Sequence, residues 1–194
     1  MLAGIFIALA ACGSVSVSPD LAGIIFSTGL IMVIIGGAEL FTGNCLTITD
    51  WIDGKTSLGS LMSRWTKVYI ANFIGAMLVV LTSGIHADVT QKLNLTFTQA
   101  FFEGVWCNVL VCMAVIMARK ADSTAGKVLV TIFPVWLFVA CGFEHSIANM
   151  FFIPSAIMAG TATWSGFIIN IVPVTMGNMF GGVLVAYTYW RGSR

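Results

Sequence analysis

The chain has 194 residues, of which 58% are hydrophobic and 9% are charged, and its mean hydropathy is +0.97. Soluble domains carry about 25% charged residues, so this composition excludes a soluble enzyme and a disordered chain. The formal net charge is only +1, which also argues against nucleic acid as a partner. Because a membrane-spanning helix needs about 20 apolar residues, the chain has room for about six spans with short loops.

Apolar runs separated by charged or turn-forming segments define the predicted fold. The breaks fall at Ser18-Pro19-Asp20, at 50–67, at 86–94, at 119–127 and at the uncharged segment 160–165. They predict an all-α membrane protein with a single transmembrane domain over residues 1–194. The six predicted spans are 1–18, 21–49, 67–85, 97–118, 128–160 and 164–190.

Basic residues gather on one side of this predicted domain. Three lie in the second break, three in the fourth and two at the C-terminus, which makes eight of the nine. Lys92, in the third break, is the exception. Because cytoplasmic loops carry the excess of Lys and Arg, we expect a multi-pass inner (plasma) membrane protein with both termini in the cytoplasm. The eight are Lys55, Arg64, Lys67, Arg119, Lys120, Lys127, Arg191 and Arg194.

The two halves of the chain repeat each other. Residues 37–44 and 142–149 share the pattern G-x-E-x-x-x-x-N at an offset of 105, and residues 72–75 match 178–181 at an offset of 106. A weaker match joins 3–5 with 103–105. Three matches in the same order predict two repeats, about 1–90 and 91–194. Because each repeat has three spans, the second crosses in the opposite direction, and inverted repeats place a substrate path at the midplane.

The second and fifth predicted spans are too long for one crossing, and each carries a glutamate near its middle. We expect both helices to break there, with Glu39 and Glu144 accepting the backbone N–H groups that the break frees. A proton-carrying role for the two glutamates is the alternative. The second half-helices would begin near Asn44 and Asn149 and direct their N-termini at the bilayer centre, which favours an anion there.

These motifs resemble the formate/nitrite transporter family over nearly the whole chain. The segments that carry the resemblance are residues 37–44, 107–112, 142–154 and 173–178. The resemblance implies an aquaporin-like protomer, a homopentamer with one pore per protomer, and a small monovalent anion such as formate, nitrite or hydrosulfide as substrate. The family usually begins with a cytoplasmic amphipathic helix, whereas Met1 here falls inside the first span, so we expect a natural N-terminal segment to be missing.

Four polar residues are candidates for the substrate pathway. His145 lies beside the second break, where its imidazole can donate a hydrogen bond to an anion or pass on a proton. The Thr42 hydroxyl lies in the first break, and the resemblance places it opposite His145. The resemblance also pairs Lys92, as an anion-attracting residue, with Asn108. Asn72 and Asn178 are interpreted as hydrogen-bonding residues between helices.

Five apolar residues are candidates for constrictions that exclude hydrated ions. Ordinary packing is the alternative for each of them. The resemblance implies one constriction towards the cytoplasm, formed by Leu30, Leu40 and Phe138, and one towards the outside, formed by Phe26 and Phe41.

No sequence motif indicates a cofactor, a metal site or a catalytic constellation, and the five cysteines are interpreted as apolar packing residues. The predicted partners are a small anion, the lipid bilayer and further copies of the chain, with no nucleic acid. The proposed mechanism is neutralisation of the anion by a proton from His145 or water, because a neutral acid crosses apolar rings at lower cost. A neutral-solute channel and a membrane enzyme or scaffold remain the alternatives, and the sequence does not select among formate, nitrite and hydrosulfide.

Overall fold

The computed structural model describes residues 1–192, and within them every regular element is a helix. Arg194, one of the predicted cytoplasmic basic residues, lies outside the described residues. Three helices, α5, α7 and α10, are long and apolar enough to cross a membrane, and α1, α2, α8 and α9 are shorter apolar helices. The elements are α1 (Leu2–Val15), α2 (Pro19–Ile35), α3 (Phe41–Asn44), η1 (Cys45–Thr47), α4 (Ile48–Ile52), α5 (Leu58–Ser83), α6 (Thr90–Leu93), α7 (Phe97–Lys120), α8 (Thr124–Ala140), α9 (Ser146–Met158) and α10 (Trp164–Gly192).

The largest difference from the predicted spans lies before α5. The charge and turn signals of 50–67 predict a break that includes residues 58–66, but these residues form the first turns of α5. Ser57 caps this helix by accepting a hydrogen bond from the Ser60 backbone N–H at 3.2 Å. A cap of this kind stabilises a helix start whatever the hydropathy of the first turns, so Arg64 and Lys67 lie on a helix and not in a loop.

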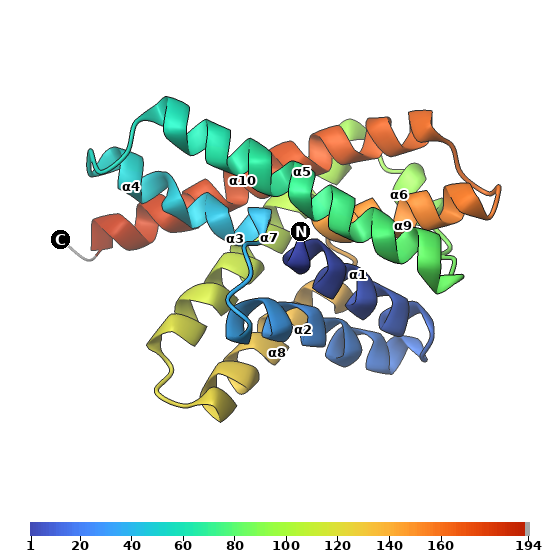
Figure 1. The fold of residues 1–194 in the computed structure, drawn as a ribbon, viewed down its shortest axis with the longest axis horizontal. Helices are drawn as coiled ribbons and strands as arrows, with labels where there is room; N and C mark the ends of the chain where they lie inside the picture. Colours follow the sequence, from blue (N-terminus) through green and yellow to red (C-terminus); the bar gives the residue numbers. More distant parts are fainter. Residues whose placement is uncertain (193–194) are drawn as a thin grey trace.

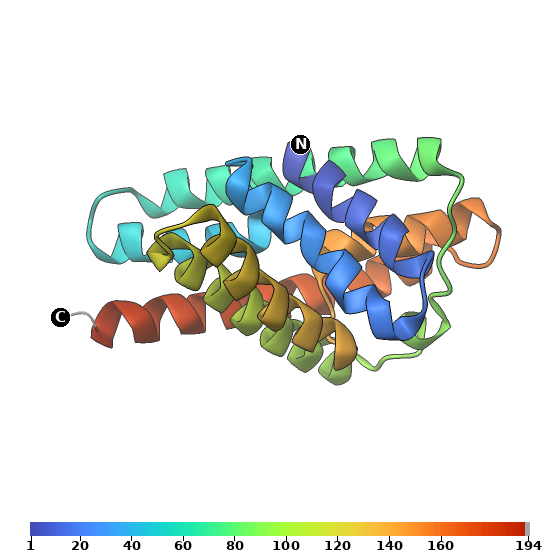
Figure 2. The same ribbon diagram turned by 90° about the horizontal axis from the view of Figure 1, so that it is seen from below.

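The short helices α3 to α4 and α9 lie between two long ones. Figure 1 shows α4 near the C-terminal end of α10, whereas α9 lies towards the opposite end of the molecule. Figure 2 shows both segments between α5 and α10. The contacts agree, because α9 packs on both long helices, α3 packs on α5, and η1 packs on α10. The chain segments that interrupt the helices therefore lie in the middle of the protein.

The helices break at the two repeated motifs, as expected. α2 ends at Ile35 and α3 begins at Phe41, while α8 ends at Ala140 and α9 begins at Ser146. Gly37 and Gly142 adopt left-handed backbone conformations with φ of 66° and 70°, which favour glycine. In each case the next N–H donates to the carbonyl five residues earlier, at 3.0 Å. Both helices thus end in the same Schellman motif, and the chain turns back towards the centre.

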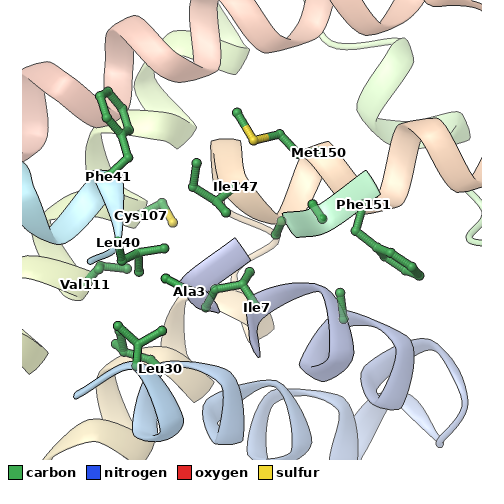
Figure 3. Close-up of a cluster of buried hydrophobic side chains, with 14 of the residues drawn as sticks. Ala3, Ile7, Leu30, Leu40, Phe41, Cys107, Val111, Ile147, Met150 and Phe151 are labelled. Carbon is green, nitrogen blue, oxygen red and sulfur yellow. The ribbon is translucent and has the colours of Figure 1, made fainter. Parts of the chain in front are cut away.

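Glycines let the long helices approach closely at two further places. A Cβ added at Gly75 of α5 would overlap the Met1 carbonyl at the start of α1, and one at Gly181 of α10 would overlap the Val105 carbonyl of α7. Small residues of this kind permit close helix packing inside membranes. Apolar side chains fill the centre, where Figure 3 shows Ala3 and Ile7 of α1 near Ile147 of α9.

Candidate functional site

The two interrupted segments meet through a contact between polar side chains. Thr42 Oγ1 and His145 Nε2 are 3.1 Å apart, although the residues are separated by 103 positions in the chain. Thr42 is 0% exposed and His145 is 3% exposed. The structure therefore brings together the two residues predicted to face the centre of the pathway.

The hydrogen-bond partners of His145 determine which ring nitrogen carries the proton in the neutral ring. The Ala148 backbone N–H donates to Nδ1 at 3.1 Å, so Nδ1 is an acceptor. A neutral imidazole has one acceptor and one donor nitrogen, so Nε2 carries the hydrogen and donates towards Thr42 Oγ1. If the His145 ring were charged, Nδ1 would also carry a hydrogen, and this hydrogen would face the Ala148 N–H hydrogen with no acceptor between them. This geometry therefore favours neutral His145 with its one donor aimed into the contact.

Two asparagines hold the segments before α3 and α9, and the sequence analysis assigned them only to contacts between helices. Asn72 accepts a hydrogen bond from the Phe41 N–H at 3.0 Å and donates to the Glu39 carbonyl at 3.1 Å. Asn178 accepts from the Ser146 N–H at 2.8 Å and donates to the Glu144 carbonyl at 2.9 Å. The amide side chains thus satisfy the first backbone groups of the two half-helices. Their matched positions in the repeats were the signal that could have revealed this role.

The two glutamates therefore do not accept the freed backbone N–H groups, which corrects that expectation. Glu39 accepts from the Asn44 side chain at 3.2 Å and from Arg64 at 2.7 Å. Glu144 accepts from the Asn149 side chain at 2.6 Å. An amide can both accept and donate, and so can bridge an N–H and a carbonyl, whereas a carboxylate only accepts.

Lys92 and Asn108 have different partners. Lys92 Nζ contacts Glu144 Oε1 at 2.5 Å, and the Glu144 side chain is 2% exposed. Asn108 is fully buried and donates to the Thr42 carbonyl at 3.1 Å and to the Asn178 carbonyl at 2.6 Å. The lysine thus neutralises a buried carboxylate, and Asn108 fixes the backbone of the segment that carries Thr42.

Two separate hollows lie one after the other along α2. The first, the Lys92 hollow, has a volume of about 180 Å³, and its lining includes Phe26, Lys92 and His145. The second, the Leu30 hollow, has a volume of about 230 Å³, and its lining includes Leu30, Leu40 and Asn44. Leu30 and Leu40 approach one another in Figure 3. Phe26 and Leu30 are about one helical turn apart, so little protein separates the hollows along α2.

Two of the five predicted constriction residues lie elsewhere than expected. Phe138 was grouped with Leu30 and Leu40, but it lines the Lys92 hollow, with its ring centroid 5.7 Å from that of Phe26 and 6.0 Å from that of His145. The chain turns back after α8, so Phe138 lies beside His145 and not two helical turns away from it.

Phe41 is the other displaced residue. It was grouped with Phe26, but its ring packs on α5, 4.7 Å from the Tyr69 centroid and 6.4 Å from the Trp65 centroid. It belongs to the lining of neither hollow, and Figure 3 shows it at the start of α3. Its position corresponds to a packing residue that anchors α3 on α5.

Interrupted apolar helices, buried polar side chains where they meet and hollows to either side are the architecture of a membrane transport protein. A family model described as Formate/nitrite transporter matches residues 1–191, and the chain therefore belongs to the formate/nitrite transporter family. This confirms the resemblance read from the motifs. It also confirms that the chain is a transport protein and not an enzyme.

Relatives and solved structures agree with this assignment. A "Probable formate transporter" from Methanothermobacter thermautotrophicus is 40% identical over 199 aligned positions, which cover 87% of this chain and 73% of the relative. A structure described as "FNT family ion channel" is 28% identical with a TM-score of 0.92, covering 100% of this chain and 88% of that one. A "Pentameric formate channel with formate bound" is 34% identical with a TM-score of 0.80, covering 98% and 93%.

Proposed function

We propose that this protein is a channel for small monovalent anions of weak acids, with formate as its principal substrate. The observation that carries the proposal is the buried Thr42–His145 contact between the two hollows, at a separation of 3.1 Å. The "Pentameric formate channel with formate bound" supports both the substrate and a homopentamer with one pathway in each protomer. Nitrite and hydrosulfide are the alternative substrates, because a short polar contact between apolar walls suits any of the three anions.

The membrane arrangement that supports this function has six crossings in two inverted repeats. In it, α2 with α3 to α4 forms the second crossing, and α8 with α9 forms the fifth. The matched glycines at 37 and 142 and the matched asparagines at 72 and 178 support the repeat. The bias of basic residues places both termini in the cytoplasm of an inner-membrane protein. The Leu30 hollow then opens towards the cytoplasm, and the Lys92 hollow opens towards the outside.

The constrictions determine the form in which the substrate crosses. Phe26 and Phe138 form the outer constriction, and Leu30 and Leu40 form the inner one. Stripping the water from an anion costs tens of kcal/mol in an apolar medium, whereas the neutral acid crosses at far lower cost. The substrate therefore passes the constrictions as the neutral acid and is held as the anion only between them, by the donors of Thr42 and His145.

Water is the source of the proton in this mechanism. A neutral His145 that gave up its Nε2 hydrogen would become an imidazolate, so the ring acts as a hydrogen-bond donor and not as the acid. The Lys92 hollow has a volume of about 180 Å³, enough for several water molecules at about 30 Å³ each. A water molecule in this hollow can protonate the anion and leave as hydroxide.

Uptake of formate, nitrite and hydrosulfide into proteoliposomes, measured over a pH series, tests the proposal. His145→Asn is the informative variant because Asn is a good N-cap, so it can still accept from the Ala148 N–H while the donor towards Thr42 is lost. A hydrogen bond to a charged group contributes about 2 kcal/mol, so we expect roughly a 30-fold loss of formate flux. The matched control is His86→Asn, because His86 is exposed and belongs to the lining of neither hollow.

Two outcomes would contradict the proposal. If His145→Asn kept both the rate and the pH profile of the wild type, the role of His145 in anion passage would be wrong. If wild-type liposomes conducted water or glycerol but none of the three anions, the protein would be a neutral-solute channel.

A further inference from the structure

The lining of the Leu30 hollow includes a basic side chain that has no role in the mechanism proposed so far. Arg119, in the last turn of α7, lines this hollow together with Leu30, Leu40 and Asn44. It is the only charged side chain in that lining within the part of the chain that the structure describes. The hollow has a volume of about 230 Å³, enough for roughly seven water molecules at about 30 Å³ each. A small anion and some of its water therefore fit in this hollow, which the exposed Arg119 lines.

The charge balance of the two hollows differs. Lys92 forms an ion pair with Glu144, so the Lys92 hollow gains no net charge from that lysine. Glu39, which accepts from Asn44 at the edge of the Leu30 hollow, forms an ion pair with Arg64 at 2.7 Å. The ion pairs within residues 1–192 do not include Arg119. The Leu30 hollow is thus the one whose lining cation has no carboxylate partner among the described residues.

We propose that the Leu30 hollow is a second anion-binding site, in which the Arg119 guanidinium binds a small monovalent oxyanion before it reaches the Leu30–Leu40 constriction. The inference rests on the proposed function in one respect, that the bound anion is also the transported one. A guanidinium presents paired N–H donors whose geometry matches a carboxylate. A cation at the mouth of a low-dielectric cleft also raises the local concentration of anions and so their rate of entry.

The flux experiment compares two adjacent basic residues. Both residues line a hollow between α7 and the end of α10, but only Arg119 also lines the Leu30 hollow. At about 10 mM ionic strength, where charges act over about 30 Å, we expect Arg119→Gln to reduce formate flux about fivefold. At about 1 M ionic strength, the formate flux of Arg119→Gln should be within about twofold of the wild-type flux. Lys120→Gln should match the wild type at both ionic strengths, and Arg119→Lys should restore part of the flux.

A binding measurement separates this inference from the proposed function. Saturation-transfer NMR of formate on the detergent-solubilised protein reports binding without transport. We expect a signal in the wild type and in Lys120→Gln that falls about twofold in Arg119→Gln, because the site at Thr42 and His145 remains. If this pattern appears while liposomes conduct no formate, the site stands and the proposed function fails. If the wild type conducts formate but Arg119→Gln keeps full binding and full low-salt flux, or if Lys120→Gln loses as much, the second site is refuted.

Discussion

The side chain of Asn178 is expected to contribute strongly to stability because it holds the start of α9. Its amide accepts from the Ser146 N–H at 2.8 Å and donates to the Glu144 carbonyl at 2.9 Å and to the Gly104 carbonyl of α7 at 2.8 Å, and the residue is 0% exposed. An unpartnered buried N–H costs about 2 kcal/mol and an unpartnered carbonyl about 1 kcal/mol, so Asn178→Ala should lose about 3 kcal/mol. Asn72→Ala removes the matching pair of bonds before α3 and should lose about the same.

Thermal unfolding of the purified protein, followed by fluorescence of its six tryptophans, measures this loss. For a chain of this size, about 3 kcal/mol corresponds to a decrease in Tm of roughly 6 to 12 °C. Asn178→Leu separates the hydrogen bonds from the cavity, because it keeps the branched shape and the four heavy atoms of the side chain and should lose nearly as much. The exposed Asn94→Ala is the control. A Tm for Asn178→Leu within about 2 °C of the control would show that packing, and not the amide, holds the interrupted helix.

Three further predictions use the same assays. Gly142→Ala should cost about 1 to 2 kcal/mol because its φ is 70°, whereas Gly59→Ala, where a Cβ on the helix would make only an ordinary contact with Ser57 Oγ at 4.0 Å, should cost nothing. Phe138→Ala should raise the flux of acetate relative to formate in liposomes, and an unchanged ratio would exclude it from the constriction. In a double-mutant cycle, Lys92→Met should lose about 3 kcal/mol, since it leaves the buried Glu144 carboxylate unpaired. Addition of Glu144→Gln should recover at least half of that loss, and a simple sum of losses would contradict the pairing.

The sequence predicted the places where the chain leaves helical structure, because the cause there is local. A glycine followed by a glutamate inside an overlong apolar run is hard to accommodate in one straight helix, and both breaks lie at these motifs. The position of Thr42 opposite His145 was expected from the resemblance to the formate/nitrite transporter family, and the two side chains are in contact. The breaks needed only local sequence, whereas this contact needed the family's known arrangement.

The errors came from contacts whose geometry depends on how the chain turns back. The resemblance grouped Phe138 with Leu30 and Leu40, but the chain reverses direction after α8, and the Phe138 ring lies 6.0 Å from the His145 ring. The sequence also does not show whether the backbone N–H groups at the starts of α3 and α9 donate to a carboxylate or to an amide side chain. Asn178 lies 34 positions from the Glu144 carbonyl to which it donates, and only the packing of α10 on α9 brings them together.

The two repeats have the same backbone turns, but the residues that differ between their matched segments make the site between them asymmetric. The glycines, glutamates and asparagines of the motifs recur at an offset of 105, and they form the same turns and the same side-chain bonds in both halves. At that offset, however, His145 corresponds to Leu40 and Thr42 corresponds to Ile147. Each half therefore supplies one polar group and one apolar group. In the proposed function, an anion at this contact would meet a donor from each side, while Leu40 lines the Leu30 hollow.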